Sequence, residues 1–468
     1  MKRSLLALSL VSSTTLALST TWLVGPSQTY TTPNALYLAD AGASISIADG
    51  DTILIDSAEY VGSDALAAWQ QDDLYIQGVN GRPRLIAAGA YILGKGIWVC
   101  AGNNQTVDNF EFQDASVPDM NGAGIRLDGV GLTVRNCYFH DNENGILTSN
   151  PYAGDILIEY SEFEANGYGD GFTHNMYIGH VNNFTIRFCY THHTDVGHNI
   201  KSRAENNYIL YNRIMDEETG NSSRLIDVPN GGYCMIKGNT MMQGENALNN
   251  NCIGYGKEGL VNSPPHELYI VNNTIINKRV ASCNYVDVAS GTDVAYIINN
   301  IFAGEGNELV GSATTYTNNY YTDDISSMLF EDEANYNYRL LVGSPAIDSG
   351  ETQAAPHIAE YEYLPDLDGS ARPVYGSSID VGAYEFFIDE TGLSGSEEDK
   401  LLVYPNPTEG VLCFSQDEFA YEVYDLSGKL LLKGVVDSKL DVSELSSGVY
   451  LIHLLGENDE FQIRFEKK

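Results

Sequence analysis

Two four-residue strings bring together side chains that can move a proton. They are His174-Asn175-Met176-Tyr177 and His198-Asn199-Ile200-Lys201, and they are offset by 24 residues. A third stretch, Arg224-Leu225-Ile226-Asp227, follows at nearly the same interval. A phenol, an amine and guanidinium groups in one groove suit proton abstraction next to a carboxylate. The cations neutralise the carboxylate so that the neighbouring C–H becomes acidic, and a base takes the proton.

A uronic acid unit in a polysaccharide offers that chemistry, because it can lose its C5 proton while the 4-O-linked sugar leaves by β-elimination. Lys201 can serve as the base if neighbouring arginines lower its pKa. Tyr177 can serve as the acid, or as the base if the same positive field acts on the phenol. The carboxylate would be held by Arg224, Arg203 or Arg126.

A repeat positions these residues. The pattern of an apolar pair, a small or amide residue and a further apolar residue recurs nine times between Thr106 and Tyr321, at offsets of 19 to 34 residues. Short strands separated by Gly and Asn turns at a drifting period near 25 indicate a solenoid, in which no coil buries its apolar face alone. We therefore predict an all-β fold, a right-handed parallel β-helix with three short strands in each coil.

Alternation along each strand sorts the side chains of the repeat. The column Ile146, Met176, Ile200 and Ile226 should point into the solenoid. The column Arg126, Leu147, Tyr177, Lys201 and Asp227 should point outward, one residue per coil, flanked by His174, His198, Arg203 and Arg224.

The fifth position of the repeat predicts an asparagine ladder. It is occupied by Asn212, Asn239, Asn273, Asn300 and Asn319 in five consecutive copies. Side-chain amides at the ~4.8 Å spacing of stacked strands can bond to their copies in the next coil. The same position holds Cys137 and Cys189 two coils apart, too far for a disulfide. The seven cysteines match no zinc motif, and we expect no disulfide framework.

The C-terminal residues 401–468 form three alternating apolar runs separated by turns, which indicates a small all-β module. The module closely resembles the C-terminal sorting domain of the Bacteroidetes type IX secretion system. The resemblance rests on Pro405-Asn406-Pro407, Asp425-Leu426-Ser427-Gly428-Lys429, Gly448-Val449-Tyr450 and Lys467-Lys468. It implies export across two membranes to the cell surface or beyond, with the secretion machinery as a partner.

These signals divide the chain into four parts. A charged start followed by a short apolar stretch indicates a signal peptide over residues 1–19 rather than a membrane span. The β-helix with its closing segment is expected over residues 20–386, and a polar, Gly/Ser/acid-rich linker over 387–400. The β-sandwich sorting domain occupies 401–468.

The solenoid region resembles the β-helical polysaccharide lyases of the pectate lyase, alginate lyase and chondroitinase B kind. In that family a Lys and an Arg on adjacent coils carry catalysis, which Lys201 and Arg224 match. Calcium (Ca2+) assists some members. No cage of acids surrounds Lys201, although Asp195, Asp216, Glu217 and Glu218 follow nearby. We expect four catalytic residues, Lys201, Tyr177, Arg224 and His198, and five substrate-binding residues, His174, Asn175, Asn199, Arg203 and Arg126.

The net charge of −38 argues against nucleic acid and anionic membranes as partners. The expected substrate is an acidic polysaccharide, since nine Lys and Arg residues gather between Arg126 and Lys257. No nucleotide, flavin or haem motif is present, and we expect a monomer. Three alternatives stay open. They are a glycoside hydrolase, which needs carboxylates ~5–9.5 Å apart, a uronate epimerase, and a non-catalytic glycan-binding adhesin.

Overall fold

The computed structural model describes residues 19–387 except 281, together with 403–404, 408, 410–414, 419–425, 429–436, 438–455 and 460–468. The chain divides into two compact units, residues 1–386 and 387–468. Most of the expected signal peptide and linker, and the Pro405-Asn406-Pro407 turn, lie outside the described residues. No helix in the described ranges is long and apolar enough to cross a membrane.

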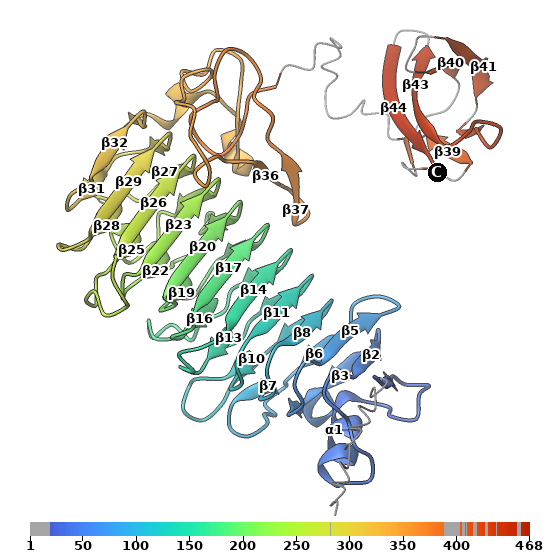
Figure 1. Cartoon of the computed structure of the whole chain (residues 1–468), viewed down its shortest axis with the longest axis vertical. Coiled ribbons are helices and arrows are strands. Elements are labelled where there is room, and N and C mark those ends of the chain that lie inside the picture. Colours follow the sequence, from blue (N-terminus) through green and yellow to red (C-terminus); the bar gives the residue numbers. More distant parts are fainter. Residues whose placement is uncertain are drawn as a thin grey trace, which may run out of the picture. The chain divides into compact units, whose positions relative to one another are not determined.

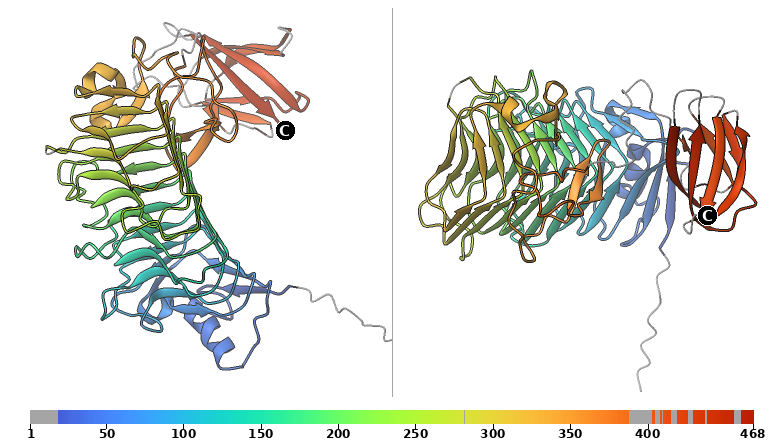
Figure 2. Two further views of the ribbon diagram at one scale, coloured as in Figure 1. Left: turned by 60° about the vertical axis from the view of Figure 1, so that its left-hand side comes forward. Right: turned by 90° about the horizontal axis from the view of Figure 1, so that it is seen from above.

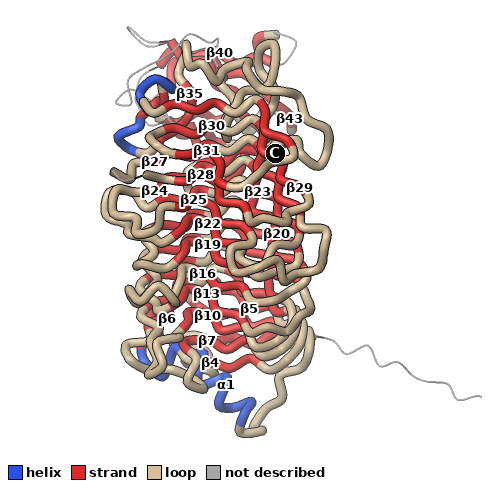
Figure 3. The backbone as a smooth tube through the Cα atoms, turned by 90° about the vertical axis from the view of Figure 1, so that its left-hand side faces the viewer, coloured by secondary structure: helices blue, strands red, loops and turns tan. Residues whose placement is uncertain are grey.

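Unit 1 is a parallel β-solenoid built from three sheets, named A, B and C (Figures 1 and 3). Sheet A contains β1 (Thr21–Val24), β2 (Thr52–Asp56), β5 (Tyr75–Val79), β8 (Gln105–Asp108), β11 (Leu132–Arg135), β14 (Asp155–Glu159), β17 (Asn183–Arg187), β20 (Asn206–Leu210), β23 (Tyr233–Lys237), β26 (Glu267–Val271), β29 (Val294–Ile298) and β32 (Thr315–Thr317). Sheet B contains β3 (Glu59–Val61), β6 (Arg84–Ile86), β9 (Glu111–Gln113), β12 (Tyr138–His140), β15 (Glu162–Glu164), β18 (Tyr190–His192), β21 (Arg213–Met215), β24 (Thr240–Gln243), β27 (Thr274–Asn277), β30 (Ile301–Ala303) and β33 (Tyr320–Thr322). Sheet C contains β4 (Ala67–Trp69), β7 (Gly96–Cys100), β10 (Ala123–Leu127), β13 (Asn144–Thr148), β16 (Met176–Ile178), β19 (His198–Ser202), β22 (Arg224–Val228), β25 (Asn251–Tyr255), β28 (Asn284–Val288) and β31 (Asn307–Val310).

The coils stack in chain order along one axis, as the left view of Figure 2 shows for unit 1. Each strand between the ends of its sheet pairs in parallel with the strand one coil before and one coil after it. The interior is filled by the inward-facing apolar residues of the strands, including the fully buried column Ile146, Met176, Ile200 and Ile226. The predicted all-β solenoid with three strands per coil is therefore confirmed.

The asparagine ladder is also confirmed. The bend before each ladder position explains why Gly or Asn often precedes the ladder residue. Asn239 Nδ2 donates to Asn273 Oδ1 over 3.0 Å and to Ile209 O over 2.8 Å. The residue before each ladder position has a positive φ, as at Gly238 (67°), Asn272 (50°) and Asn299 (58°). This left-handed conformation favours Gly and Asn. In the pairs Asn272-Asn273, Asn299-Asn300 and Asn318-Asn319, the first Asn makes the bend and the second bonds to the neighbouring coil.

Both ends of the solenoid are covered. Helix α1 (Pro33–Ala41) buries Leu36 against the N-terminal coils, and Thr32 caps the helix by accepting a hydrogen bond from the Ala35 backbone N–H. At the other end the chain continues through η2 (Ile325–Met328), β34 (Phe330–Asp332), η3 (Glu333–Asn335), β35 (Asn337–Leu340), β36 (Tyr361–Leu364) and β37 (Asp368–Ala371). Met328 of η2 and Tyr338 of β35 are buried in an apolar cluster with Met242 and Ile276 of the last coils.

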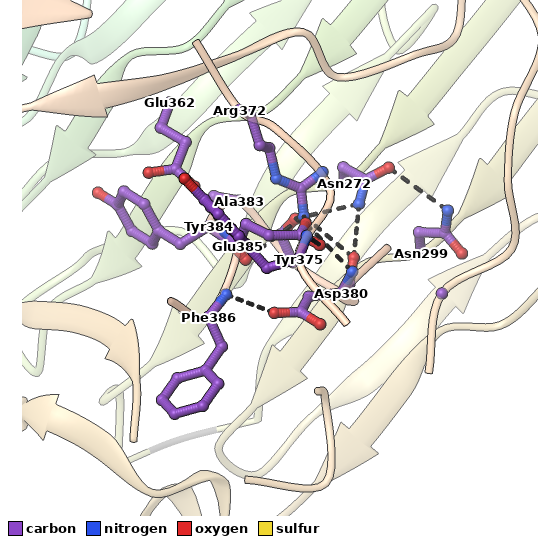
Figure 4. A network of polar contacts seen from close by, with 12 residues as sticks. Asn272, Asn299, Glu362, Arg372, Tyr375, Asp380, Ala383, Tyr384, Glu385 and Phe386 are labelled. Atoms are coloured by element: carbon purple, nitrogen blue, oxygen red, sulfur yellow. Dashed lines mark hydrogen bonds and ion pairs between the residues drawn. The ribbon is translucent and has the colours of Figure 1, made fainter. Parts of the chain in front are cut away.

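A buried polar network ties the closing segment to the last coils (Figure 4). Arg372 Nη2 lies 3.1 Å from Glu385 Oε2 and donates to the backbone oxygen of Asp380. Asn272, at a bend of the solenoid, donates to the same backbone oxygen over 3.0 Å. Burial raises the pKa of Glu385 to about 7, although Arg372 opposes that shift.

Unit 2 consists of two antiparallel sheets around one apolar core that includes Leu412, Val423 and Ile452. One sheet contains β38 (Val403–Tyr404), β39 (Val411–Phe414) and β42 (Lys439–Asp441). The other contains β41 (Leu430–Val436), β40 (Phe419–Asp425), β43 (Gly448–Leu455) and β44 (Glu460–Lys467). All seven cysteines lie in described positions and are free thiols, including Cys252 and Cys283, whose Sγ atoms are 3.1 Å apart in neighbouring coils.

Candidate functional site

The outward column of sheet C has the predicted register. Arg126 pairs with Leu147, Leu147 with Tyr177, Tyr177 with Lys201, and Lys201 with Asp227. Figure 3 looks onto this sheet, with β16, β19 and β22 near its middle. The parallel pairing sets neighbouring side chains ~4.8 Å apart, so that the phenol, the amine and the carboxylate lie side by side.

Lys201 lies between two carboxylates. Its Nζ atom is 3.1 Å from Glu258 Oε1 and 3.6 Å from Asp227 Oδ2, and its side chain is only 12% exposed. Glu258 belongs to the loop after β25, and its backbone N–H donates to Pro229 O. The pattern of residues around Lys201 did not reveal Glu258, because the two are 57 residues apart and loops between coils have no fixed length.

Arg203 links the phenol to the same carboxylate. Its guanidinium donates to Tyr177 Oη over 2.6 Å, to Glu258 Oε2 over 2.6 Å and to Asn230 Oδ1 over 2.6 Å. Although burial alone lowers the pKa of Arg203, its hydrogen bonds to Glu258 and Tyr177 raise that pKa above the ordinary value. Arg203 is therefore a fixed positive charge directed at the phenol oxygen.

Arg224 and Asp227 form the inner layer of the cluster. Arg224 Nη1 donates to Asp227 Oδ1 over 2.7 Å, and Asp227 is fully buried. Burial raises the pKa of Asp227, while Arg224 and Lys201 counteract that shift. Gly254 occupies the next outward position, where a Cβ atom would lie 3.1 Å from Asp227 Oδ1. Arg224 and Asp227 fit against β25 because Gly254 has no side chain.

The two predicted histidines form a buried, uncharged stack. Their rings are parallel at 4.9 Å, and the Tyr177 ring lies 5.8 Å from His174. The His198 backbone N–H donates to His174 Nδ1 over 3.0 Å. Burial lowers the pKa of His174 to about 3, helped by Lys201, and burial likewise lowers the pKa of His198 well below its ordinary value. Both rings are therefore neutral imidazoles. They support the outward column of sheet C, which is called the strip below.

Three of the expected substrate contacts lie elsewhere. Asn175 and Asn199 are fully buried, and Asn175 Nδ2 donates to Asn199 Oδ1 over 3.0 Å. They continue a second interior ladder that runs through Asn142 and Asn166 at the corner of the coils, so their amides do not face outward. Arg126 is outward but two strands from Tyr177, and it pairs with Asp128 at 2.8 Å.

The acidic residues considered for calcium do not surround Lys201 in the described structure. Asp195 accepts a hydrogen bond from Asn221, Asp216 is fully buried, and Glu217 pairs with Arg213. Burial is the main cause of the raised pKa of Asp216.

The cluster as a whole holds three cations and two carboxylates over neutral imidazoles. Lys201, Arg203 and Arg224 are the cations, and Asp227 and Glu258 the anions. Glu258 is the most exposed member, with a side chain 45% accessible. The arrangement can hold one carboxylate against an amine and a guanidinium, with a phenol beside it.

Comparison with known proteins identifies the C-terminal unit. Residues 402–466 match the family described as the secretion system C-terminal sorting domain. The protein is therefore exported by type IX secretion to the cell surface or the extracellular space. The chain is also 42% identical over 62 residues to beta-agarase D of Zobellia galactanivorans (strain DSM 12802). That stretch covers 13% of this chain and 13% of the agarase, so the chain spans a small part of that relative's length.

Proposed function

We propose that the protein is a secreted polysaccharide lyase that cleaves an acidic, uronate-containing glycan by β-elimination on the outer face of sheet C. One observation carries the proposal. A carboxylate, that of Glu258, is held by Lys201 and Arg203 beside the phenol of Tyr177, to which Arg203 also donates. A uronate carboxylate in the place of Glu258 would bring its neighbouring C5–H to the same amine and phenol.

The roles follow from the contacts. Tyr177 is the base that takes the C5 proton, and Arg203, which donates to its oxygen, holds it in place. Lys201 lies between two carboxylates and suits proton donation to the leaving oxygen. The C5–H bond breaks, the C4–C5 double bond forms and the C4–O4 bond breaks. Arg203 and Arg224 stabilise the charge that develops on the uronate carboxylate in the transition state.

A glycoside hydrolase is the second candidate, because the two carboxylates around Lys201 have unlike environments. Burial raises the pKa of Asp227, whereas for Glu258 the hydrogen bonds from Arg203 and Lys201 outweigh burial and lower the pKa. Hydrolases use such a split between acid and nucleophile. Asp227 is fully buried beneath Arg224 and Lys201, however, so a glycosidic oxygen would not reach it without a rearrangement.

The test is the near-ultraviolet absorbance of unsaturated uronates, measured with the purified full chain on alginate, pectate, chondroitin and other uronate polymers. We expect product with the wild type and at least a ~100-fold loss with Tyr177→Phe and Lys201→Ala. Lys257→Ala is the matched control, because Lys257 pairs with Asp287 on the same sheet face at 2.7 Å. Reducing ends without absorbance would favour the hydrolase, and binding without any product would favour the adhesin.

A further inference from the structure

A second group of side chains that can bind a ligand lies on the outer face of sheet B, apart from the strip on sheet C. Glu164 ends β15, His192 ends β18 one coil later, and His193 follows it at the bend. One ligand atom from each of the three lies within 4.8 Å of the others. His192 is buried, and Glu164 and His193 are half-buried, so the group is partly screened from water.

Neighbouring side chains fix the orientation of two of the three ligand candidates, His192 and Glu164. His192 Nε2 lies 3.1 Å from Glu162 Oε1, so Nδ1 is the ring nitrogen that faces His193. The Tyr190 ring stacks on His192 at 4.0 Å and fixes its plane. Tyr138 donates a hydrogen bond from its hydroxyl to Glu164. Carboxylates behind a ligating imidazole and donors behind a ligating carboxylate are the usual outer partners of bound metals.

The two imidazoles face each other through their Nδ1 atoms. His192 Nδ1 and His193 Nδ1 are 2.6 Å apart, and the ring planes are at 75°. Nitrogens bound to a tetrahedral ion at ~2.05 Å are ~3.3 Å apart. An ion would therefore widen this contact by less than ~1 Å while drawing Glu164 inward.

We propose that Glu164, His192 and His193 form a binding site for one divalent transition-metal ion of the zinc type. Two imidazoles and one carboxylate are a known zinc ligand set that leaves a fourth position for water or a ligand. The ion would connect β15, β18 and the bend after β18, which belong to two consecutive coils. The proposal is independent of the lyase proposal, because it uses none of the residues around Lys201.

The alternative is a hydrogen bond between His192 and His193 with no ion, and metal titration decides between them. The full chain without a polyhistidine tag would be stripped with a chelator, dialysed and titrated with zinc chloride by calorimetry. Cobalt(II) would report the ligand geometry through its visible absorption. We expect one ion per chain for the wild type, and an affinity at least roughly 100-fold weaker for His193→Ala and Glu164→Gln.

Three further variants make the result interpretable. Glu162→Gln should bind about tenfold more weakly, because it loses the partner that orients His192. His357→Ala, which removes a half-buried histidine stacked on Tyr269, should bind like the wild type. Lys201→Ala should also bind like the wild type. Absence of stoichiometric binding, or equal binding by folded His193→Ala, would overturn the proposal. His193→Gln, checked by circular dichroism, replaces His193→Ala if that variant does not fold.

Discussion

The two carboxylates that hold Lys201 differ in burial and should therefore differ in what they contribute to folding. Asp227 is fully buried, with Oδ1 2.7 Å from Arg224 Nη1 and Oδ2 3.6 Å from Lys201 Nζ. Glu258 reaches the same lysine from a loop, and its side chain is 45% exposed. The substitutions Asp227→Asn and Glu258→Gln each remove one negative charge from the same cluster and leave its shape nearly unchanged.

We expect Asp227→Asn to lower the free energy of unfolding by about 3 kcal/mol. Removal of one partner of a buried ion pair typically costs ~3–5 kcal/mol, because the other charge remains buried without compensation. The lower end applies here, since the Asn oxygen can still accept the hydrogen bond from Arg224. Glu258→Gln should cost at most about 1 kcal/mol, because exposed ion pairs are screened by water. Its effect should shrink further as salt is added.

Chemical unfolding of the full chain, followed by far-ultraviolet circular dichroism, measures both values. The slope of the transition must be compared between variants, because long repeat proteins can lose cooperativity. Equal effects of the two substitutions, or a larger effect of Glu258→Gln, would show that burial does not decide the energetics of this cluster.

Four further outcomes follow from the same structure. Asn239→Ala should destabilise the solenoid by about 3 kcal/mol in chemical unfolding, because it leaves several buried ladder partners unpaired. His174 has a folded pKa of about 3, so the unfolded chain binds its extra proton below pH ~6.5 and stability falls as the pH decreases. The loss in free energy of unfolding between pH 7 and pH 5 should therefore be smaller in His174→Asn than in the wild type, by up to about 2 kcal/mol. Glu385 has a raised folded pKa of about 7, so its effect is opposite, and stability is lost as the pH rises from about 4.5 to 7. Glu385→Gln should remove about 2 kcal/mol of that loss, which thermal unfolding across this range would detect. If the strip binds uronates, Glu258→Gln should lower the KM for a cleaved polymer and leave kcat within about threefold, and an unchanged or higher KM would argue against a shared carboxylate site.

The sequence was sufficient to predict the solenoid and the outward column of sheet C. In a parallel solenoid, residues one coil apart in sequence are neighbours in space, so a single repeat length places Tyr177, Lys201 and Asp227 in one row. The same rule relates Glu164 to His192, which are 28 residues apart at matching positions of the repeat. The repeat length alone therefore predicts this second pair of neighbours as well.

The loops and corners were not predictable in the same way. Glu258 reaches Lys201 from a loop whose length is not set by the repeat. Asn199 lies on β19 between His198 and Ile200, both of which pair with β22. Its amide nevertheless enters the interior ladder, because the alternation of side chains fails where a strand leaves the corner. Hydrogen-bond partners across such a corner depend on the three-dimensional path of the chain and not on spacing.

The balance of charge explains why Glu258 is the member that a ligand would replace. In a protein of net charge −38, three buried or half-buried cations need compensating carboxylates in the resting state. Hydrogen bonds from Arg203 and Lys201 overcome the effect of burial and lower the pKa of Glu258, so it is ionised at neutral pH. Exchange of this carboxylate for that of a uronate would leave the charge of the cluster unchanged, and it would not require the cations to be desolvated again. Asp227 cannot exchange in this way because it has no exposed surface, so it holds Lys201 and Arg224 in place whichever carboxylate occupies the outer position.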